Sequence, residues 1–125
     1  MSKTRTQAEL ALSAVARAMV RGESVMNYGD LAESIGRGRG EGRLIGPVLD
    51  ELARICRDSG LPDAATVVCT GESIASGNPM PSDAAFVDSR TKVTGIARVD
   101  IAAEQARVRS YPWLDLMSVT LPPGR

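Results

Sequence analysis

Apolar residues recur at three- and four-residue spacings in three stretches of the chain, which is the period of a helix with one buried face. The three predicted helices span residues 7–20, 28–35 and 41–59. Each is followed by a glycine, a residue that often ends a helix because it adopts the left-handed conformation freely. The glycines are Gly22, Gly36 and Gly60. The first half of the chain is therefore predicted to be helical.

Two residues bear on where these helices begin. Asn27 precedes the second helix and is a typical N-cap, since its side chain can accept from free backbone N–H groups. Pro47 lies inside the third, where proline costs about 3 kcal/mol unless it occupies the first turn. Either that helix starts near Gly46, with Pro47 in its first position, or it starts at residues 41–43 with an irregular first turn. We favour the second start.

The second half of the chain is less periodic. Residues 66–69 are β-branched and apolar, which predicts a short buried strand, and residues 71–83 form a loop rich in Gly, Ser, Pro and Asn. Residues 84–87 are a second strand or the start of a wing. Residues 96–109 predict a fourth helix that the Tyr111-Pro112-Trp113 run ends. Its expected apolar face is Ile96, Val99, Ala103 and Ala106, and a last strand is expected at Trp113, Leu114 and Leu116.

The predicted order is helix, helix, turn, helix, strand, loop and strand, which is the order of a winged helix. We therefore expect an α+β fold, a winged helix-turn-helix with three to four helices and a small antiparallel sheet. Residues 28–60 are the helix-turn-helix. The length of 125 residues fits one domain over residues 1–125, with frayed ends at residues 1–5 and 120–125.

Composition narrows the function classes. Lys plus Arg equals Asp plus Glu, at 15 each, so the chain is not predicted to be a strong nonspecific polyanion binder. The 2 cysteines, Cys56 and Cys69, lack the spacing of a metal clip and do not make a disulfide framework. We expect no metal and no cofactor. The sequence shows no membrane-spanning or signal segment, and a cytoplasmic location is expected.

Three arginines gather at the predicted start of the third helix. Arg37, Arg39 and Arg43 lie in a glycine-rich turn, and in a helix-turn-helix the second helix places its first residues in the major groove. Arginine can read guanine edges or clamp phosphates. Double-stranded DNA is the expected partner, although such turns are also common as solvated loops. Tyr28 either stacks on a sugar-phosphate or staples the start of its helix.

The run Tyr-Gly-Asp-Leu-Ala at residues 28–32, with Arg-Leu-Ile-Gly at residues 43–46, resembles the DNA-binding domain of alkylguanine alkyltransferases and alkyltransferase-like proteins. The resemblance implies that Arg43 enters the duplex in place of a flipped base. Those enzymes need a Pro-Cys-His-Arg motif, in which histidine activates the thiol. Here Cys69 follows two valines, and the chain contains no histidine. We therefore expect no alkyl transfer, because a nucleophilic thiol needs a base or a cationic neighbourhood.

A second resemblance covers more of the chain. It adds the Gly-Leu-Pro run at residues 60–62, the valine strand, the Glu-Gln-Ala-Arg-Val run at residues 104–108 and the Tyr-Pro-Trp run. This series is similar to a small domain found alone or beside HNH-type nucleases in bacterial modified-DNA restriction and phage defence. The loop after the strand departs from the pattern of that family. The resemblance implies a module in DNA transactions and supplies no catalytic residue.

The sequence thus predicts a non-catalytic DNA-binding module that contacts duplex DNA, modified or unmodified, in a restriction, defence or repair-sensing setting. Its predicted contact residues are Tyr28, Arg37, Arg39 and Arg43. The alternative is a protein-interaction module, such as a defence accessory or a phage-encoded antagonist, because a fold alone does not assign function. A nuclease is one partner of that kind.

Overall fold

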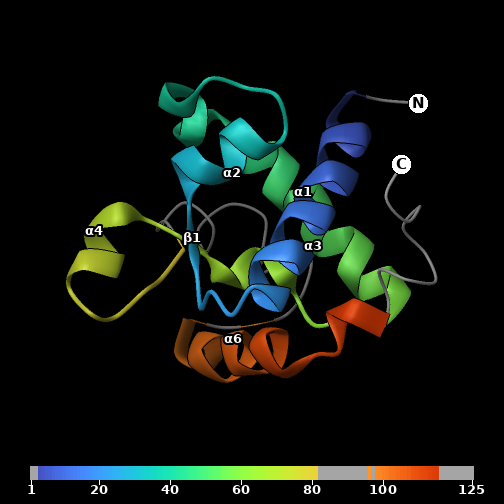
Figure 1. The fold of residues 1–125 in the computed structure, drawn as a ribbon, viewed down its shortest axis with the longest axis vertical. Coiled ribbons are helices and arrows are strands. Elements are labelled where there is room, and N and C mark those ends of the chain that lie inside the picture. Colours follow the sequence, from blue (N-terminus) through green and yellow to red (C-terminus); the bar gives the residue numbers. More distant parts are fainter. Residues whose placement is uncertain (1–2, 82–95, 97, 116–125) are drawn as a thin grey trace.

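Helices dominate this computed structural model, which describes residues 3–81, 96 and 98–115. Helical residues make up 71% of that part of the chain and strands 4%, so packing of helix on helix sets the fold. The elements are α1 (Lys3–Val20), β1 (Met26–Asn27), α2 (Tyr28–Ser34), the 3-10 helix η1 (Arg39–Leu44), α3 (Gly46–Ser59), the 3-10 helix η2 (Ala64–Val67), β2 (Val68–Cys69), α4 (Gly71–Ala75), the 3-10 helix η4 (Arg98–Asp100) and α6 (Ile101–Ser110) (Figure 1).

The two short strands run parallel, with Met26 opposite Val68 and Asn27 opposite Cys69. The expected α+β winged helix with an antiparallel sheet is therefore wrong. Parallel strands need a long crossover connection, and α2, η1 and α3 supply it here. The other predicted strand, residues 84–87, lies outside the described residues.

α1 is the helix on which the first half of the molecule is built. α3 packs chiefly against α1, whereas α2 packs chiefly against η1 and more lightly against α1. The predicted helix-turn-helix at residues 28–60 thus has the expected order of elements, but its two helices contact each other little. The reason is the residues between them, which form a separate 3-10 helix that occupies the side of α2.

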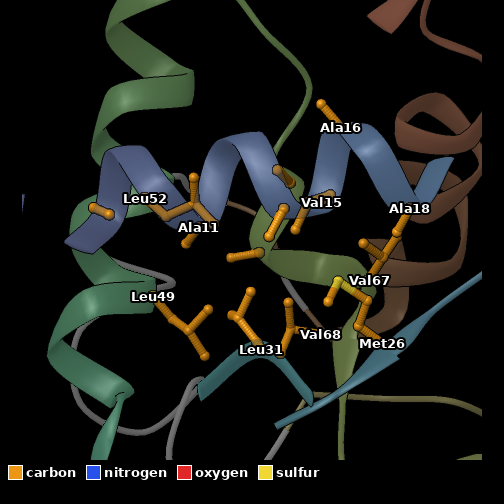
Figure 2. Packing of buried hydrophobic residues seen from close by; sticks show 14 of the residues in the cluster. Ala11, Val15, Ala16, Ala18, Met26, Leu31, Leu49, Leu52, Val67 and Val68 are labelled. Atoms are coloured by element: carbon orange, nitrogen blue, oxygen red, sulfur yellow. The ribbon is translucent and has the colours of Figure 1, made fainter. Parts of the chain in front are cut away.

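Small aliphatic side chains fill the core between these helices. Figure 2 shows Ala11 and Val15 of α1 among leucines of α2 and α3, a valine of η2 and a valine of β2. The labelled leucines and valines are Leu31, Leu49, Leu52, Val67 and Val68, all fully buried. Alanines on α1 let the other elements approach it closely, which suits a chain with only 3% aromatic residues.

Local cap chemistry confirms several predicted helix ends. The Asp30 backbone N–H donates to Asn27 Oδ1 at 2.7 Å, so Asn27 caps α2 as expected. Gly22, Gly36 and Gly60 have φ values of 88°, 88° and 71°, which is the left-handed region that favours glycine. α1 starts at Lys3, earlier than predicted, so Lys3, Thr4 and Arg5 are helical instead of frayed. The expected fraying at residues 120–125 lies outside the described part of the chain.

The start of the third helix follows the alternative that we did not favour. α3 begins at Gly46, with Pro47 in its first turn, and the residues before it form η1. A continuous helix from residues 41–43 is wrong because the Pro47 ring would clash with the preceding turn.

The segment after α3 is more helical than its composition predicts. Only Val68 and Cys69 of the expected strand at residues 66–69 are extended, and η2 precedes them. The expected loop at residues 71–83 contains α4, which Thr70 caps by accepting from the Ser73 N–H at 3.1 Å.

No helix in the described ranges has the length and apolar character that crossing a membrane requires.

α6 buries a different face from the one expected. Val99, Ala103 and Ala106 are exposed, and the buried residues are Ile101, Glu104, Gln105 and Val108. The Gln105 side-chain amide donates to the carbonyls of Thr66 at 2.8 Å and Pro79 at 3.1 Å, and Glu104 accepts from the Asp63 N–H at 2.8 Å. Hydrophobic periodicity misses this face because backbone partners satisfy its polar groups.

Trp113 closes the core beneath α6. Its side chain is 1% exposed, its indole N–H donates to the Val108 carbonyl at 2.7 Å, and its ring lies 4.7 Å from that of Tyr111. The predicted last strand is wrong at Trp113 and Leu114, which are helical, while Leu116 lies outside the described residues.

Candidate nucleic-acid interface

The predicted contact arginines lie in residues 37–44, which we call the arginine segment. It connects α2 to α3 and contains η1. Figure 1 shows it at the end of the molecule opposite α6. The segment is mostly exposed, so a large ligand can approach it without displacing the core.

Close backbone packing holds the arginine segment against the start of α2. Gly42 is buried, and a Cβ atom built there would lie 2.9 Å from both Gly29 N and Tyr28 C. From the other side, a Cβ atom at Gly29 would lie 3.2 Å from the Arg39 carbonyl oxygen. The missing side chains thus allow η1 to sit directly on α2, which gives the segment a defined shape.

Two further hydrogen bonds fix the entry to η1. The Arg37 N–H donates to the Ala32 carbonyl at 2.9 Å, continuing the end of α2. The Gly38 N–H donates to Glu41 Oε2 at 3.1 Å, so the Glu41 carboxylate caps the first turn of η1. One hydrogen bond to α2 and one within the segment therefore order the turn.

Arg37 and Arg39 point to different partners. Arg37 Nη2 donates to Gln7 Oε1 on α1 at 3.1 Å. Arg39 Nη1 forms ion pairs with Asp30 and, at 3.1 Å, with Glu33, both on α2. The hydrogen bond to Asp30, followed by its charge, raises the pKa of the Arg39 guanidinium above its ordinary value. The two side chains therefore leave the segment on different sides.

Tyr28 and Arg43 complete the predicted set. Tyr28 begins α2, is half-buried and packs against the core. The backbone of Arg43 lies in η1, close to the start of α3, and its side chain lies outside the description that the structure gives. Thus the structure brings the backbones of all four residues together, and Arg37 and Arg39 are the described cations among them.

The acidic partners of this surface were missed in the sequence. Residues 28–44 carry three arginines and three carboxylates, Asp30, Glu33 and Glu41, so the surface is neutral overall. The spacing of Asp30 and Glu33 places both on one side of a helix, and this pattern is the signal that could have identified them. The charge balance of the whole chain is therefore repeated at its candidate site.

Neither cysteine is suited to nucleophilic chemistry. Cys69 is fully buried, and its sulfur lies 3.6 Å from both the Thr66 carbonyl oxygen and Gln105 Nε2. Burial raises the pKa of Cys69 to about 12, and burial also raises that of Cys56 to about 12. Both remain thiols at neutral pH, whereas the nucleophile would be the thiolate.

Across the described residues, His, Cys, Asp and Glu form no group of three or more that could hold a metal ion.

No protein-family model, curated protein or solved structure matches the chain. The arguments for function therefore rest on the residues of this chain and on the surfaces that they form.

Proposed function

We propose that the protein is a non-catalytic binding module that contacts duplex DNA through the arginine segment. The observation that carries the proposal is the exposed, glycine-packed turn at one end of the molecule that presents Arg37 and Arg39. A defined backbone lowers the entropy lost when arginines order on a ligand. Arginine also binds phosphate with two parallel hydrogen bonds.

DNA phosphates must compete with Asp30 and Glu33 for Arg39. Both side chains of each ion pair are exposed. Exposed ion pairs contribute little to stability, so a DNA phosphate can replace the carboxylates as the partner of Arg39. Because the surface is neutral overall, only a few phosphates are neutralised. With two or three such contacts, the slope of log K against log salt is about −2 to −3. We therefore expect modest affinity that disappears at high salt.

The biological setting that fits this proposal is bacterial DNA restriction, phage defence or the sensing of altered bases, as the two resemblances in the sequence imply. Two free, buried cysteines are compatible with a reducing cytoplasm, which is where we place the protein. Within this proposal Arg43 is the residue that would enter the duplex, and Tyr28 supports the start of α2.

Arg39→Ala weakens binding to a fluorescein-labelled duplex and lowers the salt slope by about 1, because one phosphate contact is lost. The measurement is fluorescence anisotropy over a range of salt concentrations, starting at low salt. The matched control is Arg54→Ala, which removes a half-buried arginine that pairs with Glu51 on α3. Wild-type protein that fails to bind the duplex at low salt, or equal effects of the two variants, would contradict the proposal.

A protein-interaction module is the second candidate function, and one observation favours it. The arginine segment combines paired charges with Leu44, whose side chain is 58% exposed. A large apolar residue surrounded by polar groups is a usual composition for a protein-binding surface. This candidate predicts a stable complex with a partner, such as a nuclease, that survives neutralisation of Arg37 and Arg39, in a protein that does not bind DNA.

A further inference from the structure

A groove of about 240 Å³ lies along one flank of α1, outside the arginine segment. Leu10, Ala14, Arg17 and Arg21 follow one another at four-, three- and four-residue spacings, so they lie on the same flank of the helix. Met26 of β1 and Ser34 at the end of α2 complete the lining. The groove therefore runs where α1 meets β1 and α2.

The lining surface of the groove is more polar than apolar, and Leu10 is its exposed apolar residue. Ala14 and Met26 are buried at its base, and Leu10 leaves 47% of its surface exposed. Its volume is below the roughly 300 Å³ at which pockets for drug-sized ligands begin. The space fits one large apolar side chain of a partner. Burial of that side chain in the groove would cover Leu10.

Cations border the groove. Arg17 makes no ion pair or side-chain hydrogen bond with any other residue that the structure describes, whereas Arg21 pairs with Glu23 at 2.8 Å. At the other end Arg37 reaches α1 at Gln7, one helical turn before Leu10. An occupant that carries carboxylates beside its apolar side chain would give Arg17 a partner that it lacks among the described residues.

We propose that this groove docks an acidic segment of a protein partner, which inserts one large apolar side chain over Leu10 and pairs a carboxylate with Arg17. The exposed Leu10 favours such a segment over a nucleic-acid backbone, whose polar phosphates gain nothing from covering an apolar side chain. The inference goes beyond both candidate functions, because it places a protein partner on the flank of α1 and does not depend on any contact at the arginine segment.

The test uses a fluorescein-labelled peptide of about sixteen residues that combines glutamates with leucines at helical spacing. A second peptide replaces each glutamate with glutamine. We expect the protein to bind the acidic peptide saturably below about 1 mM, and Arg17→Ala and Leu10→Ala each to weaken binding about five- to tenfold. Arg54→Ala is the matched control and leaves binding unchanged. The glutamine peptide binds at least tenfold more weakly.

The same variants are also titrated with the labelled duplex. Failure of the groove proposal can then be distinguished from failure of the DNA-binding proposal. Peptide binding that depends on Arg17 and not on Arg39 supports the groove, whatever the duplex does. Absence of saturable peptide binding overturns the inference, as does wild-type affinity in both Arg17→Ala and Leu10→Ala. Duplex binding that is lost in Arg17→Ala while the peptide does not bind also overturns it, because the flank would then contact nucleic acid.

Discussion

Replacement of Trp113 by alanine lowers the free energy of unfolding by about 3–5 kcal/mol. The side chain is 1% exposed and is among the largest that are fully buried. Truncation leaves a cavity beneath α6 and removes the hydrogen bond that the indole donates to the Val108 carbonyl. It also removes the ring contact with Tyr111. Few other aromatic residues are present to fill the space, because aromatics make up only 3% of the chain.

Urea unfolding followed by far-UV circular dichroism measures this loss, since the variant lacks the only tryptophan and its fluorescence. Leu114→Ala is the matched control. Its side chain is 63% exposed, so its free energy of unfolding should stay within about 0.5 kcal/mol of the wild type. A small loss for Trp113→Ala, similar to that of Leu114→Ala, would show that Trp113 does not close the core.

Gly42→Ala destabilises the protein by about 1–3 kcal/mol and weakens binding at the arginine segment. The new Cβ atom would lie 2.9 Å from two backbone atoms of α2, and backbone cannot rotate away as a side chain can. η1 must therefore shift away from α2. Arg39 moves with it and away from the ligand, so a stability defect and a binding defect are expected together.

Gly40→Ala is the control within the same 3-10 helix. A Cβ atom at this position meets nothing within 4 Å, and its backbone does not need the left-handed region. Its stability should be unchanged or higher by about 0.4–1 kcal/mol, because alanine restricts the unfolded chain. Urea unfolding followed by Trp113 fluorescence compares the two variants. Equal stabilities for Gly42→Ala and Gly40→Ala would mean that η1 does not depend on this close approach.

Features set by neighbouring residues were predictable from the sequence. The Asn27 cap depends on a side chain and an N–H group three residues away, and the Gly60 stop depends on one φ angle. The helical stripe of α3 has the same local character. Such features need no knowledge of the remote parts of the chain, and they are the features that the structure confirms.

Features set by distant contacts were not predictable. Whether β2 runs parallel or antiparallel to β1 depends on the path of the chain through η2, and no local sequence pattern predicts that path. The buried face of α6 depends on Gln105 meeting the carbonyls of Thr66 and Pro79, so a polar residue occupies a core position. Pro47 is the opposite case, because its own ring disfavours a helix that starts at residues 41–43, so this local restriction already favoured the start at Gly46.

The position of the candidate site could be predicted from the sequence, but the charge of its surface could not. Arginine and glycine content identified the segment between α2 and α3. The spacing of Asp30 and Glu33 placed them on one side of a helix, but it did not identify Arg39 as their partner, and nothing in the sequence paired Arg37 with Gln7. Those partners come from α1 and α2, and their pairing depends on how η1 packs. The prediction of a cluster of arginines that contact DNA therefore becomes one of a neutral surface whose Arg39 must first leave its carboxylates.

The central claim is that DNA phosphates replace the carboxylates of Asp30 and Glu33 as the partners of Arg39. The Asp30→Asn/Glu33→Gln double variant tests this claim most directly. The measurement is its affinity for the labelled duplex at low salt. The control is Glu72→Gln/Asp100→Asn, which changes the net charge equally at two exposed residues that form no ion pair within the described chain. The account predicts that the Asp30/Glu33 variant binds several-fold more tightly than this control. Equal or weaker binding would contradict it.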